Sequence, residues 1–157
     1  MSYVLGARSL RNLERVHPQL VRVVKRAIQI SSQDFMVIEG VRSKEQCWVN
    51  YGKGRSAVQC QQAGVPAKYA QPQAAKVTWL RDPLNSKHCI QSDGFGHAVD
   101  LVPYPIDWND LKKFDAIAAA MKQAAKECGV PVRWGADWDN DGKPRERGET
   151  DSPHFEL

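Results

Sequence analysis

Two short segments of the chain contain the residues best suited to bind a metal ion and to catalyse hydrolysis. The first runs from His88 to Asp100, and the second is the sequence Asp-Ser-Pro-His at 151–154. A catalytic zinc ion takes three protein ligands, commonly histidine and carboxylate, and keeps a fourth position open. We predict that His88, Asp100 and His154 bind Zn²⁺ and that Asp151, held close to His154, acts as the general base.

Strand periodicity separates His97 from these predicted ligands. Residues 98–102, Ala-Val-Asp-Leu-Val, are rich in β-branched and apolar side chains and predict a short strand. Successive side chains of a strand point to opposite faces, so Asp100 and His97 should face in opposite directions. Near the second segment, Phe155 can anchor a strand in the core while His154 faces the site.

Four motifs in this order resemble the VanY-type zinc peptidases. They are Ser-Lys-His at 86–88, Gly-His-Ala-Val-Asp-Leu-Val at 96–102, Trp-Gly-Ala-Asp-Trp at 134–138 and Asp-Ser-Pro-His-Phe-Glu-Leu at 151–157. The set is most similar to the phage endolysins of this family, which cut the L-alanyl-D-glutamate bond of peptidoglycan stem peptides. The first histidine and the aspartate lie closer together in the family than here, so residues 89–94 form an apparent loop insertion.

The resemblance implies a role for several residues outside the ligand set. It implies that Arg42, in a Gly-x-Arg-Ser motif, holds the substrate or the oxyanion, that Gln46 contacts substrate and that Trp138 shapes the substrate-binding site. An arginine fork also suits a carboxylate or a developing oxyanion on physical grounds. The simpler alternative is an Arg42 that only forms an ion pair at the surface.

The resemblance implies a phage endolysin that hydrolyses the L-alanyl-D-glutamate bond of peptidoglycan and so lyses the bacterial host. One alternative is a D-Ala-D-Ala carboxypeptidase or dipeptidase on the same zinc scaffold, because the motifs alone do not fix which end of the stem peptide enters. A second alternative is a non-catalytic wall-binding module. A pure binder has no use for Asp151, which favours the enzyme.

An acidic stretch at 137–142, Asp-x-Asp-x-Asp-Gly, begins like a calcium-binding loop. Oxygen ligands at alternate positions would come from Asp137, Asp139 and Asp141. The glutamate that closes an EF-hand loop is absent, so Glu146 or Glu149 would have to replace it. We predict a possible Ca²⁺ site here, and the alternative is an acidic surface turn.

Composition predicts a single soluble domain over residues 1–157. The chain has 42% hydrophobic and 25% charged residues, and its formal net charge is +4. The basic residues are scattered, which argues against a nucleic-acid partner. We expect a monomer of α+β class, in which a small antiparallel sheet carries the zinc site, helices pack on one side of the sheet, and no separate wall-binding domain is present.

The sequence also predicts where the protein is made. The N-terminal residues do not read as a signal peptide, and no stretch approaches the roughly twenty apolar residues of a membrane span. We therefore expect synthesis in the host cytoplasm and action on the cell wall after release through a membrane lesion. The four cysteines show no Cys-x-x-Cys spacing, and we predict that all four are reduced thiols.

Segments farther from the motifs predict individual elements of the fold. We expect a helix with Pro18 in its first turn, a strand over 34–39, a second strand over 76–80, and a long helix that ends at Gly129.

Overall fold

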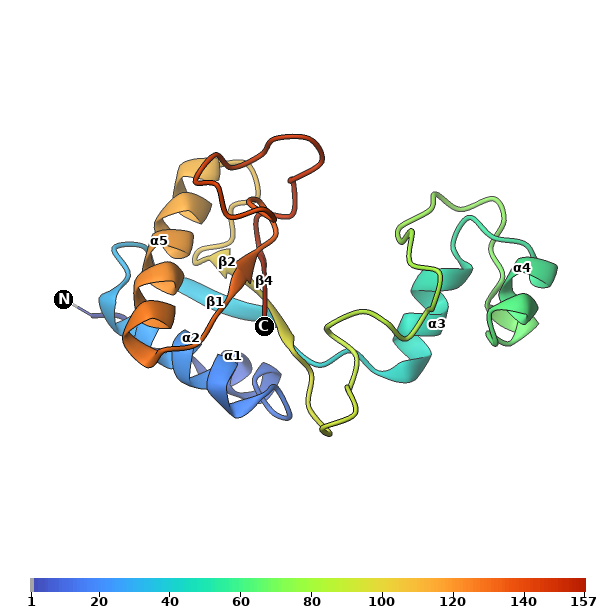
Figure 1. Ribbon diagram of the computed structural model, residues 1–157, viewed down its shortest axis with the longest axis horizontal. Helices are drawn as coiled ribbons and strands as arrows, with labels where there is room; N and C mark the ends of the chain where they lie inside the picture. Colours follow the sequence, from blue (N-terminus) through green and yellow to red (C-terminus); the bar gives the residue numbers. More distant parts are fainter. Residues whose placement is uncertain (1) are drawn as a thin grey trace.

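In the computed structural model, which describes residues 2–157, the chain forms two lobes of unequal size (Figure 1). The larger lobe contains a four-stranded sheet and the helices α1 (Ala7–Asn12), α2 (Pro18–Ile30) and α5 (Leu111–Cys128). The smaller lobe contains α3 (Lys44–Gly52), α4 (Ala57–Gln62) and the 3-10 helix η1 (Ala67–Tyr69). Because the smaller lobe lies in sequence between two strands of the sheet, the chain leaves the larger lobe and returns to it.

The sheet is antiparallel throughout, with the strand order β1-β2-β4-β3. Its strands are β1 (Phe35–Glu39), β2 (Ala98–Pro103), β3 (Arg133–Trp134) and β4 (His154–Glu156). The two central strands align Asp100 with His154 and Val99 with Phe155. This register places both predicted ligands side by side on one face of the sheet, and it confirms the predicted α+β class.

Two long helices supply most of the large core. Helix α2 buries one face, and α5 packs against α2 and β2. The buried α2 residues recur at helical spacing, as an amphipathic helix requires: Leu20, Val23, Val24, Ala27 and Ile28. Pro18 begins α2 as predicted, and Gly129 ends α5 in the left-handed conformation at φ +68°.

The smaller lobe has a core of its own, but it is small. The buried residues of this core are Tyr51, Cys60 and Val65. The prediction of a strand over 76–80 is wrong, because this segment pairs with no strand among residues 2–157 and is held by side chains instead. Arg55 Nη2 donates to the carbonyl oxygen of Thr78 at 2.9 Å, and the Thr78 hydroxyl accepts from a backbone N–H two residues on at 3.3 Å.

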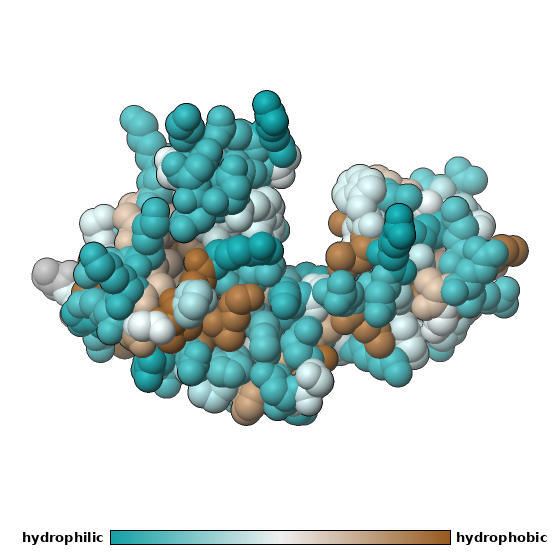
Figure 2. Space-filling view, in the orientation of Figure 1, coloured by the Kyte–Doolittle hydropathy of each residue, from teal (hydrophilic) through white to brown (hydrophobic). Residues whose placement is uncertain are grey.

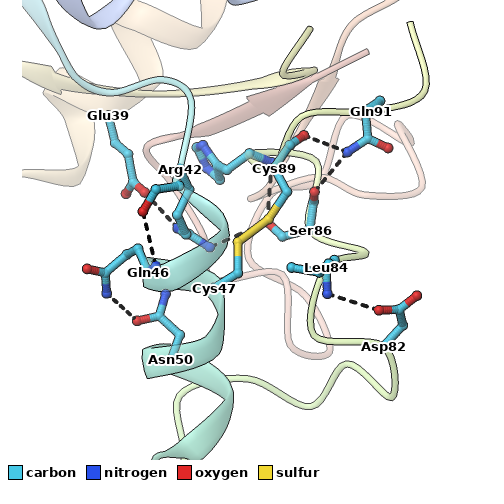
Figure 3. Close-up of a disulfide and its surroundings, with 12 residues drawn as sticks. Glu39, Arg42, Gln46, Cys47, Asn50, Asp82, Leu84, Ser86, Cys89 and Gln91 are labelled. Atoms are coloured by element: carbon cyan, nitrogen blue, oxygen red, sulfur yellow. Dashed lines mark hydrogen bonds and ion pairs between the residues drawn. A yellow bond between two sulfur atoms is a disulfide. The ribbon is translucent and has the colours of Figure 1, made fainter. Parts of the chain in front are cut away.

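A disulfide between Cys47 and Cys89 joins the two lobes (Figure 3). Cys47 lies on α3, and Cys89 follows His88 in the loop that returns to the larger lobe. The prediction of four reduced thiols is therefore wrong for this pair, whereas Cys60 and Cys128 are free. The two bonded cysteines are 42 positions apart, so only the tertiary fold brings them together.

Within residues 2–157, no helix has both the length and the apolar character that a membrane span requires.

Candidate active site

A cleft of about 400 Å³ lies between the two lobes, where the space-filling view shows a hollow (Figure 2). Its inner wall contains the three predicted metal ligands together with Asp151 and Arg42. Its outer wall comes from the smaller lobe and the loop that follows it, through Asn50, Lys53 and residues between 77 and 80. The structure thus brings the catalytic candidates together at one wall of a cleft.

Three ligand atoms form a nearly equilateral triangle. His88 Nε2 lies 3.2 Å from His154 Nδ1 and 3.2 Å from Asp100 Oδ1, and His154 Nδ1 lies 3.3 Å from the same Oδ1. In a tetrahedral zinc site with ligand distances of about 2.0–2.1 Å, two ligand atoms are about 3.3 Å apart. The triangle therefore has the size of one face of such a site.

Hydrogen bonds on the far side of each ring determine which nitrogen faces the triangle unprotonated. His88 Nδ1 lies 2.8 Å from the carbonyl oxygen of Gly40, which can only accept, so this nitrogen carries the proton. His154 Nε2 likewise lies 2.9 Å from a Glu156 carboxylate oxygen. In the neutral rings, His88 Nε2 and His154 Nδ1 thus both present lone pairs to Asp100 Oδ1, a buried atom without a hydrogen bond in the described part of the chain.

When both rings are neutral, the three facing acceptors repel one another unless a cation or a proton lies between them. Histidines that bind metals commonly donate their other N–H to a carbonyl or a carboxylate, as both of these do. Burial would lower the pKa of His154, but its contacts with Asp100 and Glu156 raise that pKa to about 9. Burial raises the pKa of Asp100, but its contacts with His154 and His88 outweigh this and lower it below its usual range. The group is thus built to hold positive charge, and it fits Zn²⁺.

Asp151 lies at the edge of this group. One of its carboxylate oxygens is 3.9 Å from His154 Nδ1, and 53% of the side chain is exposed. Partial desolvation raises the pKa of Asp151, the charge of His154 opposes this, and the charge of Asp100 reinforces it. Gly135 makes the arrangement possible, because a Cβ at this position would lie 2.8 Å from Asp151 Cβ and 3.0 Å from His154 Cβ.

Of the other predicted site residues, Arg42 lines the cleft, whereas Gln46 and Trp138 do not. Arg42 lines it, with Nε donating to Glu39 at 2.8 Å and Nη1 donating to the Ser86 hydroxyl at 3.4 Å. Gln46 is exposed and does not line the cleft. It donates to the Asn50 side chain at 2.8 Å, as Figure 3 shows, and Asn50 does line the cleft.

Trp138 packs against a predicted ligand and does not line the cleft. Its ring centroid is 5.5 Å from that of His154, with the planes tilted by 56°, and the Arg133 guanidinium lies 5.1 Å from the Trp138 centroid. Sequence reasoning missed the contribution of Glu156 to the site. The signal was present, since Glu156 lies two positions after His154 on the same face of a strand.

The acidic loop brings together Asp137, Asp139 and Glu149, whose carboxylate oxygens lie within 4.8 Å of one another. Glu149 is one of the two glutamates that sequence analysis proposed as a replacement, and its Oε1 is buried without a hydrogen bond among residues 2–157. The third predicted ligand, Asp141, is not part of this group. Its backbone N–H donates to Asp137 and Asp139 instead, at 3.2 and 3.3 Å.

The remaining histidines, His17 and His97, meet around Asp93 and not at the cleft. His97 immediately precedes β2, and its Nε2 lies 2.7 Å from an Asp93 carboxylate oxygen. His17 Nδ1 accepts the backbone N–H of Gln19 at 3.1 Å, so its proton is on Nε2, the nitrogen that faces Asp93. The imidazole N–H groups around Asp93 can therefore donate hydrogen bonds to its carboxylate. In the cleft, by contrast, the lone pairs of the neutral rings face a carboxylate oxygen.

The cleft, the His–Asp–His group and the adjacent carboxylate define a hydrolase with a candidate metal site. A family model described as phage L-alanyl-D-glutamate peptidase matches residues 1–67 and 63–157. The chain is 35% identical over 163 residues to the L-alanyl-D-glutamate peptidase of Escherichia phage T5, covering 100% of this chain and 99% of that protein. The chain belongs to the phage L-alanyl-D-glutamate peptidase family.

A solved structure supports the same assignment. The L-Ala D-Glu endopeptidase ChiX of Serratia marcescens matches with a TM-score of 0.62 and 31% sequence identity, covering 98% of this chain and 90% of that one. The protein is an L-alanyl-D-glutamate peptidase of phage type, which is a peptidoglycan-hydrolysing endolysin, as the sequence motifs predicted.

Proposed function

We propose that this peptidase works with Zn²⁺ bound by His88, Asp100 and His154. The observation that carries the proposal is the triangle of three potential ligand atoms with edges of 3.2 to 3.3 Å. Bound there, zinc would supply a Lewis acid for the scissile carbonyl and lower the pKa of a bound water toward about 7.

Asp151 acts as the general base in this proposal. Its carboxylate lies beside the ligand triangle and is open to solvent, so it can take a proton from the attacking water and deliver it to the leaving amine. The upward shift of its pKa brings its basicity closer to neutral pH. Arg42 stabilises the oxyanion that forms when the carbonyl is attacked. Glu39 and Ser86 bind two of its N–H groups and leave others free for the cleft.

Trp138 and Gln46 act on the substrate indirectly. Trp138 holds the ring of His154, and Gln46 holds Asn50, which faces the cleft. The substrate is the peptidoglycan of the bacterial wall. The enzyme acts on it as a monomeric single domain, after synthesis in the host cytoplasm and release through a membrane lesion.

The proposed function also includes a Ca²⁺ site in the acidic loop, with Asp137, Asp139 and Glu149 as its ligands. Burial raises the pKa of Asp137, and the orphaned Glu149 oxygen lacks any partner among residues 2–157. A hard cation that takes oxygen ligands would compensate the negative charges of Asp137 and Glu149. Calorimetric titration with Ca²⁺ should show one site that Glu149→Gln removes. Equal Ca²⁺ binding by this variant would exclude Glu149 as a ligand.

Mass spectrometry of fragments released from purified peptidoglycan, with and without a chelator, tests the enzymatic proposal. We expect new D-glutamate N-termini that disappear on chelation and return with added Zn²⁺. Release of terminal D-alanine alone would favour the carboxypeptidase alternative. Cleavage that a chelator leaves unchanged would refute the zinc mechanism.

A further inference from the structure

The outer wall of the cleft contains a lysine without an acidic partner. Lys53 lines the same cleft as His88, Asp100 and His154, but it belongs to the smaller lobe. Within residues 2–157, its ammonium makes no ion pair with any carboxylate. The other cation of the cleft, Arg42, is already compensated by Glu39 at 2.8 Å. Lys53 is therefore the cleft cation whose charge is free for a ligand.

The backbone around Lys53 is fixed by a Gly-Lys-Gly turn at the end of α3. A Cβ on Gly52 would collide with the carbonyl oxygen of Tyr69, and Gly54 adopts a left-handed conformation at φ +78°. Gln71 clamps both glycines, since its N–H donates to Gly52 at 2.9 Å and its carbonyl accepts from Gly54 at 2.8 Å. The turn thus holds the origin of the Lys53 side chain in one place at the cleft wall.

A second basic residue supports this wall from inside. Arg55 is buried, and its guanidinium donates to the carbonyl oxygens of Tyr51 at 2.8 Å and Thr78 at 2.9 Å. It also lies 4.0 Å from the Tyr51 ring centroid. Because Arg55 ties the end of α3 to the loop that lines the cleft, its role is structural, and Lys53 remains available to bind substrate.

The substrate brings an anion into the cleft, and this step rests on the proposed function. In peptidoglycan stem peptides, D-glutamate continues the chain through its side-chain carboxyl, so its α-carboxylate is free. This carboxylate is attached to the same carbon as the scissile nitrogen. When the L-alanyl-D-glutamate bond lies over the His–Asp–His group, a negative charge must therefore enter the cleft near Asp100 and Asp151. A charge in such a partly desolvated place needs a cationic partner.

We propose that Lys53 binds the free α-carboxylate of the D-glutamate residue and makes the enzyme selective for D-glutamate over D-isoglutamine, in which this carboxylate is an amide. Lys53 is a specificity-determining residue in this proposal and takes no part in proton transfer. Its positive charge offsets the repulsion between the substrate carboxylate and the carboxylates on the inner wall.

Two substrates and three variants of the full-length, zinc-loaded enzyme test this role. The substrates are stem peptides that contain L-alanyl-D-glutamate or L-alanyl-D-isoglutamine, and the readout is kcat/KM for each. Lys53→Met removes the charge and keeps the aliphatic stem, whereas Lys53→Arg keeps the charge. Lys44→Met is the matched control, because Lys44 is an exposed lysine at the opposite end of the same helix.

We expect Lys53→Met to lower kcat/KM for the D-glutamate substrate by about tenfold to a hundredfold, the value of one charge-assisted hydrogen bond, mainly through KM. The D-isoglutamine substrate should lose much less, since its neutral amide can accept a hydrogen bond from the ammonium but forms no ion pair with it. Lys53→Arg should retain most of the preference, and Lys44→Met should match the wild type.

The ratio of kcat/KM for the D-glutamate substrate to kcat/KM for the D-isoglutamine substrate distinguishes substrate recognition from a structural effect. If Lys53→Met slows both substrates equally, or neither, the inference is overturned while the proposed function stands. If the wild-type enzyme cleaves neither substrate, the proposed function itself fails.

Discussion

Reducing the disulfide between Cys47 and Cys89 should unfold the smaller lobe while the larger lobe stays folded. Among residues 2–157, the core cluster of the smaller lobe has only three buried residues, Tyr51, Cys60 and Val65. Segments of about 40 residues usually need a disulfide, a metal or a partner to fold stably. The larger lobe has an independent core between α2, α5 and the sheet, so it should not depend on this bond.

The expected magnitude follows from the loop that the disulfide closes. The bonded residues are 42 positions apart, and the chain-entropy relation for such a loop gives a stabilisation of at most about 4 kcal/mol at 25 °C. The small core gives this lobe few other contacts that could offset the loss. We therefore expect local unfolding of α3 and α4, which also removes the outer wall of the cleft and lowers kcat/KM.

Hydrogen exchange, read by mass spectrometry, measures this effect region by region. On treatment with a reductant, amides of α3 and α4 should lose most of their protection, whereas amides of α2 and α5 should keep theirs. A Cys47→Ala/Cys89→Ala double variant should behave like the reduced protein without any reductant. Cys128→Ser, which changes a free cysteine, is the control and should retain wild-type protection. Unchanged protection of α3 in both the reduced protein and the double variant would refute the reasoning.

Three further predictions concern the proposed metal site. His154→Ala should abolish stoichiometric zinc in purified protein, as measured by elemental analysis, whereas His97→Ala, which changes a histidine beside Asp93, should retain it; equal zinc in both variants would contradict the ligand assignment. Asp151→Asn should lower kcat by about 10²- to 10⁴-fold with zinc content unchanged, because the general base is lost but the ligands remain; near-wild-type kcat would exclude that role. In chelated protein, the His154 pKa of about 9 exceeds its unfolded value of about 6.5, so this protonated ring stabilises the fold fully below pH 6.5. The free energy of unfolding, from urea titrations, should therefore fall as pH rises from about 6.5 to about 9, and the His154→Ala variant should lack this dependence.

The inner wall of the cleft was largely predictable from sequence because local rules govern it. Strand alternation alone separated Asp100 from His97, and the structure places them in two separate groups of side chains as expected. The Asp-x-x-His spacing likewise brought Asp151 close to His154. The same alternation applies to Glu156, so its contact with His154 could also have been predicted from the sequence.

The outer wall was not predictable because it depends on contacts between distant segments. Residues 51–85 have no clear periodicity, and Arg55 holds the loop at 76–80 with a hydrogen bond to the carbonyl oxygen of Thr78. Lys53 faces the cleft only because the turn at the end of α3 packs against η1. The pairing of Cys47 with Cys89 is likewise a property of the tertiary fold, since their spacing resembles no disulfide or zinc motif.

The strand order β1-β2-β4-β3 has a consequence for how a metal ion would bind at the proposed site. β2 and β4 are neighbours in the sheet but are separated in sequence by α5, β3 and the acidic loop, so their pairing is a non-local and comparatively slow step of folding. No local segment of the unfolded chain brings the three ligands together, and a metal ion that binds them binds the native state. Metal supply then acts on the folding equilibrium by mass action. At a free metal concentration a hundredfold above the dissociation constant, metal binding would add about 2.7 kcal/mol to the free energy of unfolding.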